Sequence, residues 1–228
     1  KNGITTFCDD DILPNYMVDE ITKAKIRCCI GLKICKKKTE WANNEDESLN
    51  KALRIFDDNK NNPDIKFFFN PLSVNDVSEG MFQKISKIAN ELDIPIRMSI
   101  NTSKKEINEC IKHNKCRPLD YIEKFDILNN KFTALNTLIL NIDDVKLLEK
   151  YRSNLVINKT TQLLSEEIII DRLLERKINI ILSTGVMGNY SDSNILDEMA
   201  ILSLLSNIKK TKLNTNTILK MVTINPAL

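Results

Sequence analysis

Seven polar side chains lie at or just beyond the ends of short apolar runs, where a binding site could form. They are Asn70, Ser99, Asn101, Thr102, Asn141, Asn158 and Thr184. If the runs are parallel strands, these side chains gather at the carboxyl ends, where α/β enzymes build their sites. Amide and hydroxyl groups can bind a small polar ligand without catalysing a reaction on it. They can equally cap strands and start helices, which is the structural alternative.

A second candidate is the segment Cys110-x-x-His113-x-x-Cys116, which contains the only histidine of the chain. Its spacing resembles that of a metal site, but it offers three ligands where a structural zinc takes four. We therefore interpret His113 as a solvent-facing residue and its two neighbours as ordinary thiols. Cys28 and Cys29 are adjacent in a predicted strand, so their side chains face opposite sides, which disfavours a redox role for that pair.

Short apolar runs alternate with amphipathic stretches along the whole chain, and this rhythm positions the candidate residues. The predicted strands are residues 4–8, 26–34, 65–69, 94–100, 137–140, 154–157 and 178–182. Strands that alternate with helices are typical of consecutive βα units and a parallel sheet. Seven strands are one fewer than a closed α/β barrel of eight requires. The sequence therefore predicts an α/β fold of the TIM-type (β/α) barrel class.

Helices are predicted between these strands. One covers residues 77–92, and its buried face would consist of Phe82, Ile85, Ile88, Ala89 and Leu92. Another begins after Ser103, because Ser103 and Glu106 have the spacing of a capping box. Residues 195–205 and 217–222 repeat the helical pattern.

Composition and charge narrow the functional classes. Lys and Arg total 33 against 31 Asp and Glu, and both signs are interspersed, so nothing favours a nucleic-acid partner. No apolar stretch approaches the roughly 18 residues of a membrane span and no signal-peptide pattern opens the chain, so we expect no membrane partner and a cytoplasmic location. The six cysteines are then expected to be reduced. With only five glycines in the chain, Asn and Asp must occupy many turns.

Several motifs occur in the order and spacing of a known family. They are residues 2–9 (NGITTFCD), 70–73 (NPLS), 116–120 (CRPLD), 198–199 (EM) and 221–227 (MVTINPA). Over essentially its whole length the chain thereby resembles the amidohydrolase superfamily, nearest to its chlorohydrolase-like deaminases of methylthioadenosine and S-adenosylhomocysteine. The resemblance implies a barrel of the metal-dependent hydrolase kind, in which a zinc or iron ion activates a water molecule.

The resemblance also shows where the metal ligands and the proton-shuttle glutamate of such enzymes would fall. In this chain those positions hold Ser99, Thr102, Asn141 and Gly185, or Thr184 after a shift of one residue. The positions of a strand-four histidine and of a substrate-facing histidine of the family hold Leu72 and Ile157. None of these supplies the imidazole or carboxylate that zinc or iron prefers. We therefore expect no catalytic residue, no metal ligand and no cofactor in this chain.

These observations lead to one favoured function and two alternatives. We expect a single amidohydrolase-like barrel domain over residues 1–228, as a fragment without strand one and the flanking β-sandwich. The favoured function is a catalytically degenerate domain that binds a small molecule or assembles with a second copy or an active paralogue. One alternative is an active hydrolase or deaminase of non-peptide C–N bonds in a purine-like or cyclic amidine substrate. It would need carboxylates near the barrel mouth, for which the sequence offers Asp9, Asp10, Asp11, Asp143, Asp144 and Asp192. The other alternative is a structural subunit.

Overall fold

The chain packs as two compact units in a computed structural model. The structure describes all residues except 1–2, 11–12, 159–169, 186–193, 212 and 228. The N-terminal unit comprises Thr5–Ser99 and Glu109–Ile127. The C-terminal unit comprises Lys1–Ile4, Ile100–Asn108 and Leu128–Leu228. Helix α4 (Lys104–Asn114) contributes residues to both units.

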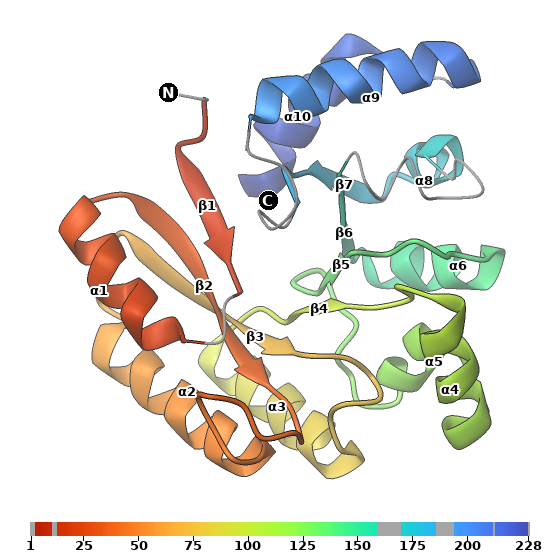
Figure 1. Cartoon of the computed structure of the whole chain (residues 1–228). Coiled ribbons are helices and arrows are strands. Elements are labelled where there is room, and N and C mark those ends of the chain that lie inside the picture. The colour runs from red at the N-terminus through yellow and green to blue at the C-terminus, as the bar shows by residue number, and fades with distance from the viewer. Residues whose placement is uncertain (1–2, 11–12, 159–169, 186–193, 212, 228) are drawn as a thin grey trace. The chain divides into compact units, whose positions relative to one another are not determined.

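The N-terminal unit is a parallel sheet with crossover helices (Figure 1). Its sheet consists of β1 (Thr6–Asp9), β2 (Arg27–Ile34) and β3 (Ile65–Pro71), and the unit also contains the short strand β4 (Arg97–Ser99), which is not a member of this sheet. Its helices are α1 (Pro14–Ala24), α2 (Glu45–Asn59), α3 (Glu79–Leu92) and α5 (Pro118–Glu123). Strands β1, β2 and β3 pair in chain order, and an isolated bridge from Phe69 to Ile96 connects β3 to the segment leading into β4.

The C-terminal unit repeats the same alternation (Figure 1). Strands β5 (Thr133–Leu135), β6 (Asn154–Ile157) and β7 (Asn179–Leu182) pair in parallel. Its helices are α6 (Ile142–Tyr151), α8 (Ile170–Glu175), α9 (Ile195–Lys209), α10 (Thr215–Val222) and the short 3-10 turn η1 (Asn225–Ala227).

A chain of side-chain amides joins the amino ends of the last two strands to the 3-10 turn. The Asn179 amide donates to Asn154 Oδ1 at 2.8 Å and to the Asn225 carbonyl at 3.1 Å. The Asn225 amide in turn donates to the Ile180 carbonyl at 2.7 Å. These bonds fix η1 to the first residues of β7.

Six of the seven predicted strands are confirmed, with ends that shift by up to three residues. The strand predicted at residues 137–140 is wrong, because the pairing strand is β5, which ends two residues before the predicted strand begins. Asn136 takes the left-handed conformation, with φ 50°, and ends the strand. The backbone N–H groups of Leu138 and Ile139 then donate to the Asn101 carbonyl instead of a neighbouring strand. The β-forming residues at 137–140 gave no sign that strand pairing ends before they begin.

The predicted helices are present, with two differences in detail. Leu92, predicted on the buried face of α3, is 42% exposed, whereas Met81, which the prediction did not include, is buried. The Ser103 hydroxyl accepts from the Glu106 N–H at 3.1 Å, as a capping box requires. The Glu106 carboxylate, however, accepts from the backbone N–H and the hydroxyl of Thr102, the residue before the cap. No helix of the described residues is long and apolar enough to cross a membrane.

Candidate functional site

Asn70 lies near the end of β3 and meets an acidic side chain from the end of β1. It is buried, and its amide donates to Asp10 Oδ2 at 3.3 Å. Between them runs β2, where Gly31 leaves room for its neighbours. A Cβ at Gly31 would lie 2.9 Å from the Phe68 ring and 3.1 Å from Asp10 Cα. Ser99, the half-buried last residue of β4, completes the predicted site residues of the N-terminal unit.

Asn101 is the most unusual polar residue of the C-terminal unit. It is 0% exposed and takes the left-handed conformation with φ 55°. Its carbonyl oxygen accepts from the N–H groups of Leu138 and Ile139, at 3.2 and 3.1 Å. Among the described residues, neither Oδ1 nor Nδ2 of its side chain has a hydrogen-bond partner. A buried polar group without a partner costs about 1–3 kcal/mol, so this amide needs an explanation.

Thr102 has a structural role at the start of α4. Its backbone N–H and its hydroxyl both donate to Glu106 Oε2, at 2.7 and 2.6 Å. Both donors are therefore satisfied within the chain, and Thr102 orders the first turn of the helix.

Asn141 also has a structural role, as the N-cap of α6. Its Oδ1 accepts from the Asp144 N–H at 2.8 Å, and its own N–H donates to Asp144 Oδ2 at 2.9 Å. This is a complete capping box, and Asn141 itself is exposed. Asp143 is engaged by Lys146 at 2.9 Å. Asp11 and Asp192, named with these aspartates as candidates for active chemistry, lie outside the described residues.

The ends of β6 and β7 bring Asn158 and Thr184 together. The Ser183 N–H donates to the Ile157 carbonyl at 2.9 Å, which extends the ladder to the residues just before them. Asn158 is buried, and Thr184 is half-buried. Gly185 has φ 75°, and a Cβ there would lie 2.9 Å from Asn158 Nδ2. The amide of Asn158 therefore lies directly against the backbone that follows Thr184.

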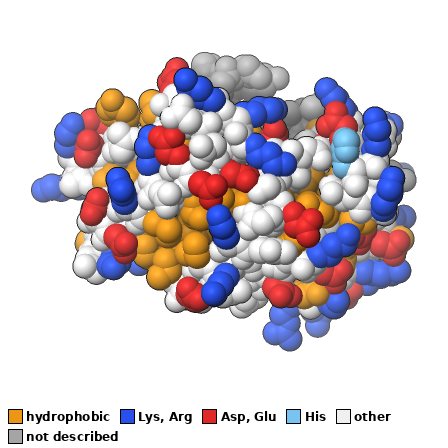
Figure 2. All heavy atoms as spheres, turned by 90° about the horizontal axis from the view of Figure 1, so that it is seen from below, with side chains coloured by type: hydrophobic (Ala, Val, Ile, Leu, Met, Phe, Trp, Pro, Cys, Tyr) orange, Lys and Arg blue, Asp and Glu red, His pale blue; other side chains and the backbone are white. Residues whose placement is uncertain are grey.

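The described residues do not fit a zinc ion by themselves. They contain no group of three or more His, Cys, Asp and Glu side chains that could hold a metal. His113 is exposed, and Figure 2 shows the single histidine on the surface. Cys110, by contrast, is fully buried. The amides and hydroxyls at the strand ends are poor ligands for zinc.

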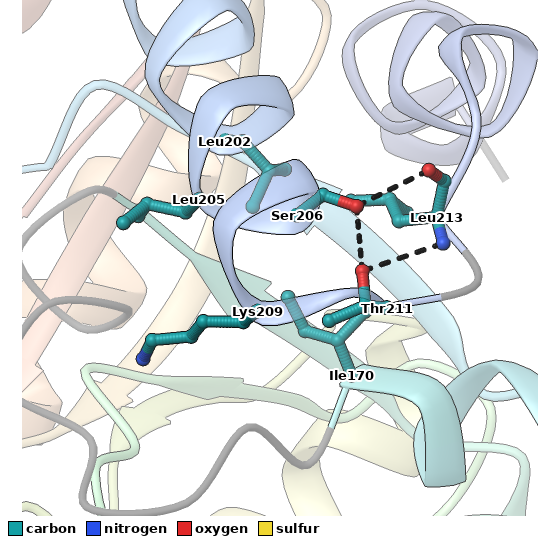
Figure 3. A pocket seen from close by; sticks show the side chains of 7 residues that line it. All are labelled: Ile170, Leu202, Leu205, Ser206, Lys209, Thr211 and Leu213. Carbon is teal, nitrogen blue, oxygen red and sulfur yellow. Dashed lines mark hydrogen bonds between the residues drawn. The ribbon is translucent and has the colours of Figure 1, made fainter.

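One small cavity lies in the C-terminal unit, away from the predicted site residues (Figure 3). Its walls come from α8, α9 and the segment after α9, and are formed by Ile170, Leu202, Leu205, Ser206, Lys209, Thr211 and Leu213. The Ser206 hydroxyl lies 2.6 Å from that of Thr211 and donates to the Leu213 carbonyl at 3.2 Å. The polar atoms thus bond to one another, and we assign this cavity no ligand.

Sequence reasoning missed one cluster, which consists of Cys8, Cys29 and Arg97. The Arg97 Nη1 donates to Cys8 Sγ at 2.8 Å, and Cys8 and Cys29 are register partners on β1 and β2. The hydrogen bond from Cys29, together with the charge and the hydrogen bond of Arg97, lowers the pKa of Cys8 to about 6, against burial and Asp10. Period-two alternation places each residue on a face of its strand. It does not give the register between strands, which creates this cluster.

Comparison with known sequences gives a consistent result. The profile of the amidohydrolase family matches residues 1–228. The 5-methylthioadenosine/S-adenosylhomocysteine deaminase of Saccharophagus degradans is 26% identical over 99% of this chain and 52% of its own length. The 5'-deoxyadenosine deaminase of Methanococcus vannielii is 23% identical over 90% of this chain and 49% of its own. The chain thus spans about half the length of these curated relatives.

Solved structures confirm the expected fold class. An adenosine deaminase from Xanthomonas campestris with bound zinc superposes with a TM-score of 0.91, at 19% identity, over 99% of this chain and 53% of its own. A zinc complex of atrazine chlorohydrolase from Arthrobacter aurescens gives 0.85, at 14% identity, over 99% and 56%. These zinc-bound structures overturn the expectation that no cofactor is used. Because the chain spans only part of such proteins, the ligands it lacks are no argument against a metal.

Proposed function

Because the chain belongs to the amidohydrolase family, we propose that it forms the nucleoside-binding part of a deaminase-like protein. In this proposal the amides at the strand ends of its C-terminal unit bind a purine-like ligand, and its own residues do not perform the acid–base step. The observation that carries the proposal is the buried Asn101 side chain, whose donor and acceptor are both unpartnered among the described residues.

An asparagine amide suits a purine for a geometric reason. It presents one acceptor and one donor group side by side. The edge of adenine offers the complementary pair, N7 as acceptor and the N6 amino group as donor, and asparagine can bind both at once. The relatives named above are deaminases of adenosine derivatives, which supports this class of ligand. Because the Asn101 amide is fully buried, a ligand would reach it only when the chain around it opens locally, and binding would then satisfy an amide that the folded chain leaves unsatisfied.

The other predicted site residues cannot carry out proton transfer. General acid–base catalysis needs a group that titrates near the operating pH. Thr102 and Asn141 are used to start helices, and Asn158 is an amide held against Gly185. None of the three can exchange a proton with a substrate near neutral pH.

The test is ligand-induced thermal stabilisation of the full-length protein by 5'-methylthioadenosine. A ligand at 100 times its dissociation constant stabilises a protein by about 2.7 kcal/mol. We expect Asn101→Gly, which tolerates the left-handed backbone, to lose this stabilisation. Asn136→Gly is the matched control, because Asn136 is also left-handed, with φ 50°, and also follows a strand of this part of the chain. Equal stabilisation of both variants would contradict the role of Asn101.

An active deaminase is the second candidate, and the names of the relatives favour it. Its signature is ammonia release from 5'-methylthioadenosine by the full-length protein. Release with a turnover that Asn101→Gly reduces would replace the binding-only proposal. A structural subunit would show neither ammonia release nor stabilisation by any purine nucleoside. The cytoplasmic location and a second copy or active paralogue as partner stay predictions.

A further inference from the structure

We propose that Cys8 and Cys29 form a redox-active thiol pair in which Cys8 is the attacking sulfur and Arg97 donates a hydrogen bond to it. The pair lies wholly in the N-terminal unit, whereas Asn101 belongs to the C-terminal unit. It would make this part of the chain a site of reversible oxidation.

The strand register places the two sulfurs on one face of the sheet. Cys8 of β1 pairs with Cys29 of β2 in parallel, so both side chains point to the same side. Neighbouring strands lie about 4.8 Å apart, within the Cα separation of about 4.4–6.8 Å that a disulfide needs. Cys28 precedes Cys29 in the same strand, so it faces the opposite side and is excluded from the pair.

Arg97 is positioned to stabilise a negative charge on Cys8. Its Nη1 donates to Cys8 Sγ at 2.8 Å, and its Cζ lies 4.7 Å from the centre of the Phe68 ring. Phe68 can occupy this place because Gly31 has no side chain, as a Cβ there would come within 2.9 Å of the ring. The guanidinium keeps its charge at every physiological pH, so its effect on Cys8 is permanent.

The charges around the pair separate the roles of the two thiols. The hydrogen bond from Cys29 and the charge of Arg97 lower the pKa of Cys8 to about 6, while burial and Asp10 oppose them. The hydrogen bond to Cys8 and burial raise the pKa of Cys29. Burial likewise raises the pKa of Cys28, to about 12. Cys8 is therefore the thiolate at neutral pH, and its side chain is exposed to a reagent.

The oxidant is a low-molecular-weight disulfide. The Cys8 thiolate attacks one of its sulfurs, forms a mixed disulfide and releases a thiolate, which takes the proton of Cys29. The Cys29 sulfur then attacks Cys8 Sγ, forms the Cys8–Cys29 disulfide and releases the second thiolate, which takes a proton from water. Two protein thiols are oxidised, and one small disulfide is reduced to two thiols.

The first experiment treats the full-length protein with oxidised glutathione and identifies the products by peptide mass spectrometry. We expect a Cys8–Cys29 disulfide in the wild type and a stable glutathione adduct on Cys8 in Cys29→Ser. In Cys8→Ser we expect neither product at these two positions. Oxidation that favours Cys116, or a Cys29→Ser protein with no adduct on Cys8, would overturn the proposal.

The second experiment needs no cysteine substitution and measures the rate of iodoacetamide labelling at each cysteine of the wild type against pH. We expect Cys8 labelling to reach half its maximum near pH 6, while Cys116 serves as the internal reference. Arg97→Gln should slow labelling of Cys8 at pH 6.5 and leave labelling of Cys116 unchanged. A Cys8 profile that coincides with that of Cys116 in the wild type would refute the activation by Arg97.

Discussion

Replacing Gly31 by alanine tests the closest packing in the N-terminal unit. The added Cβ would lie 2.9 and 3.0 Å from two ring carbons of Phe68 and 3.1 Å from Asp10 Cα. The contact to Asp10 involves backbone, and Phe68 is almost completely buried, so neither neighbour can move freely. Overpacking of this kind costs about 1–3 kcal/mol. For a protein of this size each kcal/mol lowers Tm by about 2–4 °C.

The assay is thermal unfolding followed by circular dichroism, with Gly80→Ala as the matched control. Gly80 lies in the first turn of α3, and a Cβ there would meet nothing within 4 Å. Alanine in place of a helical glycine stabilises by about 0.5–1 kcal/mol, so the two substitutions should change Tm in opposite directions. If Gly31→Ala unfolds at the wild-type temperature, the close packing of β2 against Phe68 and Asp10 does not limit the stability of the sheet.

Two further predictions concern local interactions. Asn141→Ala should lower the free energy of unfolding by about 1 kcal/mol in a denaturant titration because α6 loses its cap, whereas Asn141→Asp should retain it and neither should change nucleoside binding. The Glu47 carboxylate accepts from Lys51 and from Asn43, which lowers its pKa to about 2. Its folded pKa is below the unfolded one, so its stabilisation is present above about pH 4.5 and is lost as the pH falls toward 2. Glu47→Gln should reduce the loss of stability over this interval in acid titrations, and an unchanged profile would count against the bond to Lys51.

The sequence predicted the fold well where local pattern determines structure. The βα rhythm, the helix starting after Ser103 and the strand at 154–157 are all present. It failed at residues 137–140, because a left-handed Asn136 ends the strand and the Asn101 carbonyl captures the next two N–H groups. That bond joins segments more than 30 residues apart, and no local propensity reports it.

The candidate site residues likewise differ in whether nearby sequence predicts their role. That Asn141 and Thr102 start helices could be read from nearby residues, and this local alternative to a binding role was open from the outset. The unpartnered amide of Asn101 could not, because burial depends on what packs around it. The Cys8–Cys29 pair could not either, since it depends on the register between β1 and β2.

The amide chain from Asn154 through Asn179 to Asn225 has a practical consequence for labelling. It fixes η1 beside the first residues of β6 and β7, whereas Asn158 and Thr184 follow the last residues of the same strands. A dye attached at the exposed Ala227 of η1 would leave these bonds intact and would report on the amino-terminal rim of these strands, at the opposite end from Asn158 and Thr184.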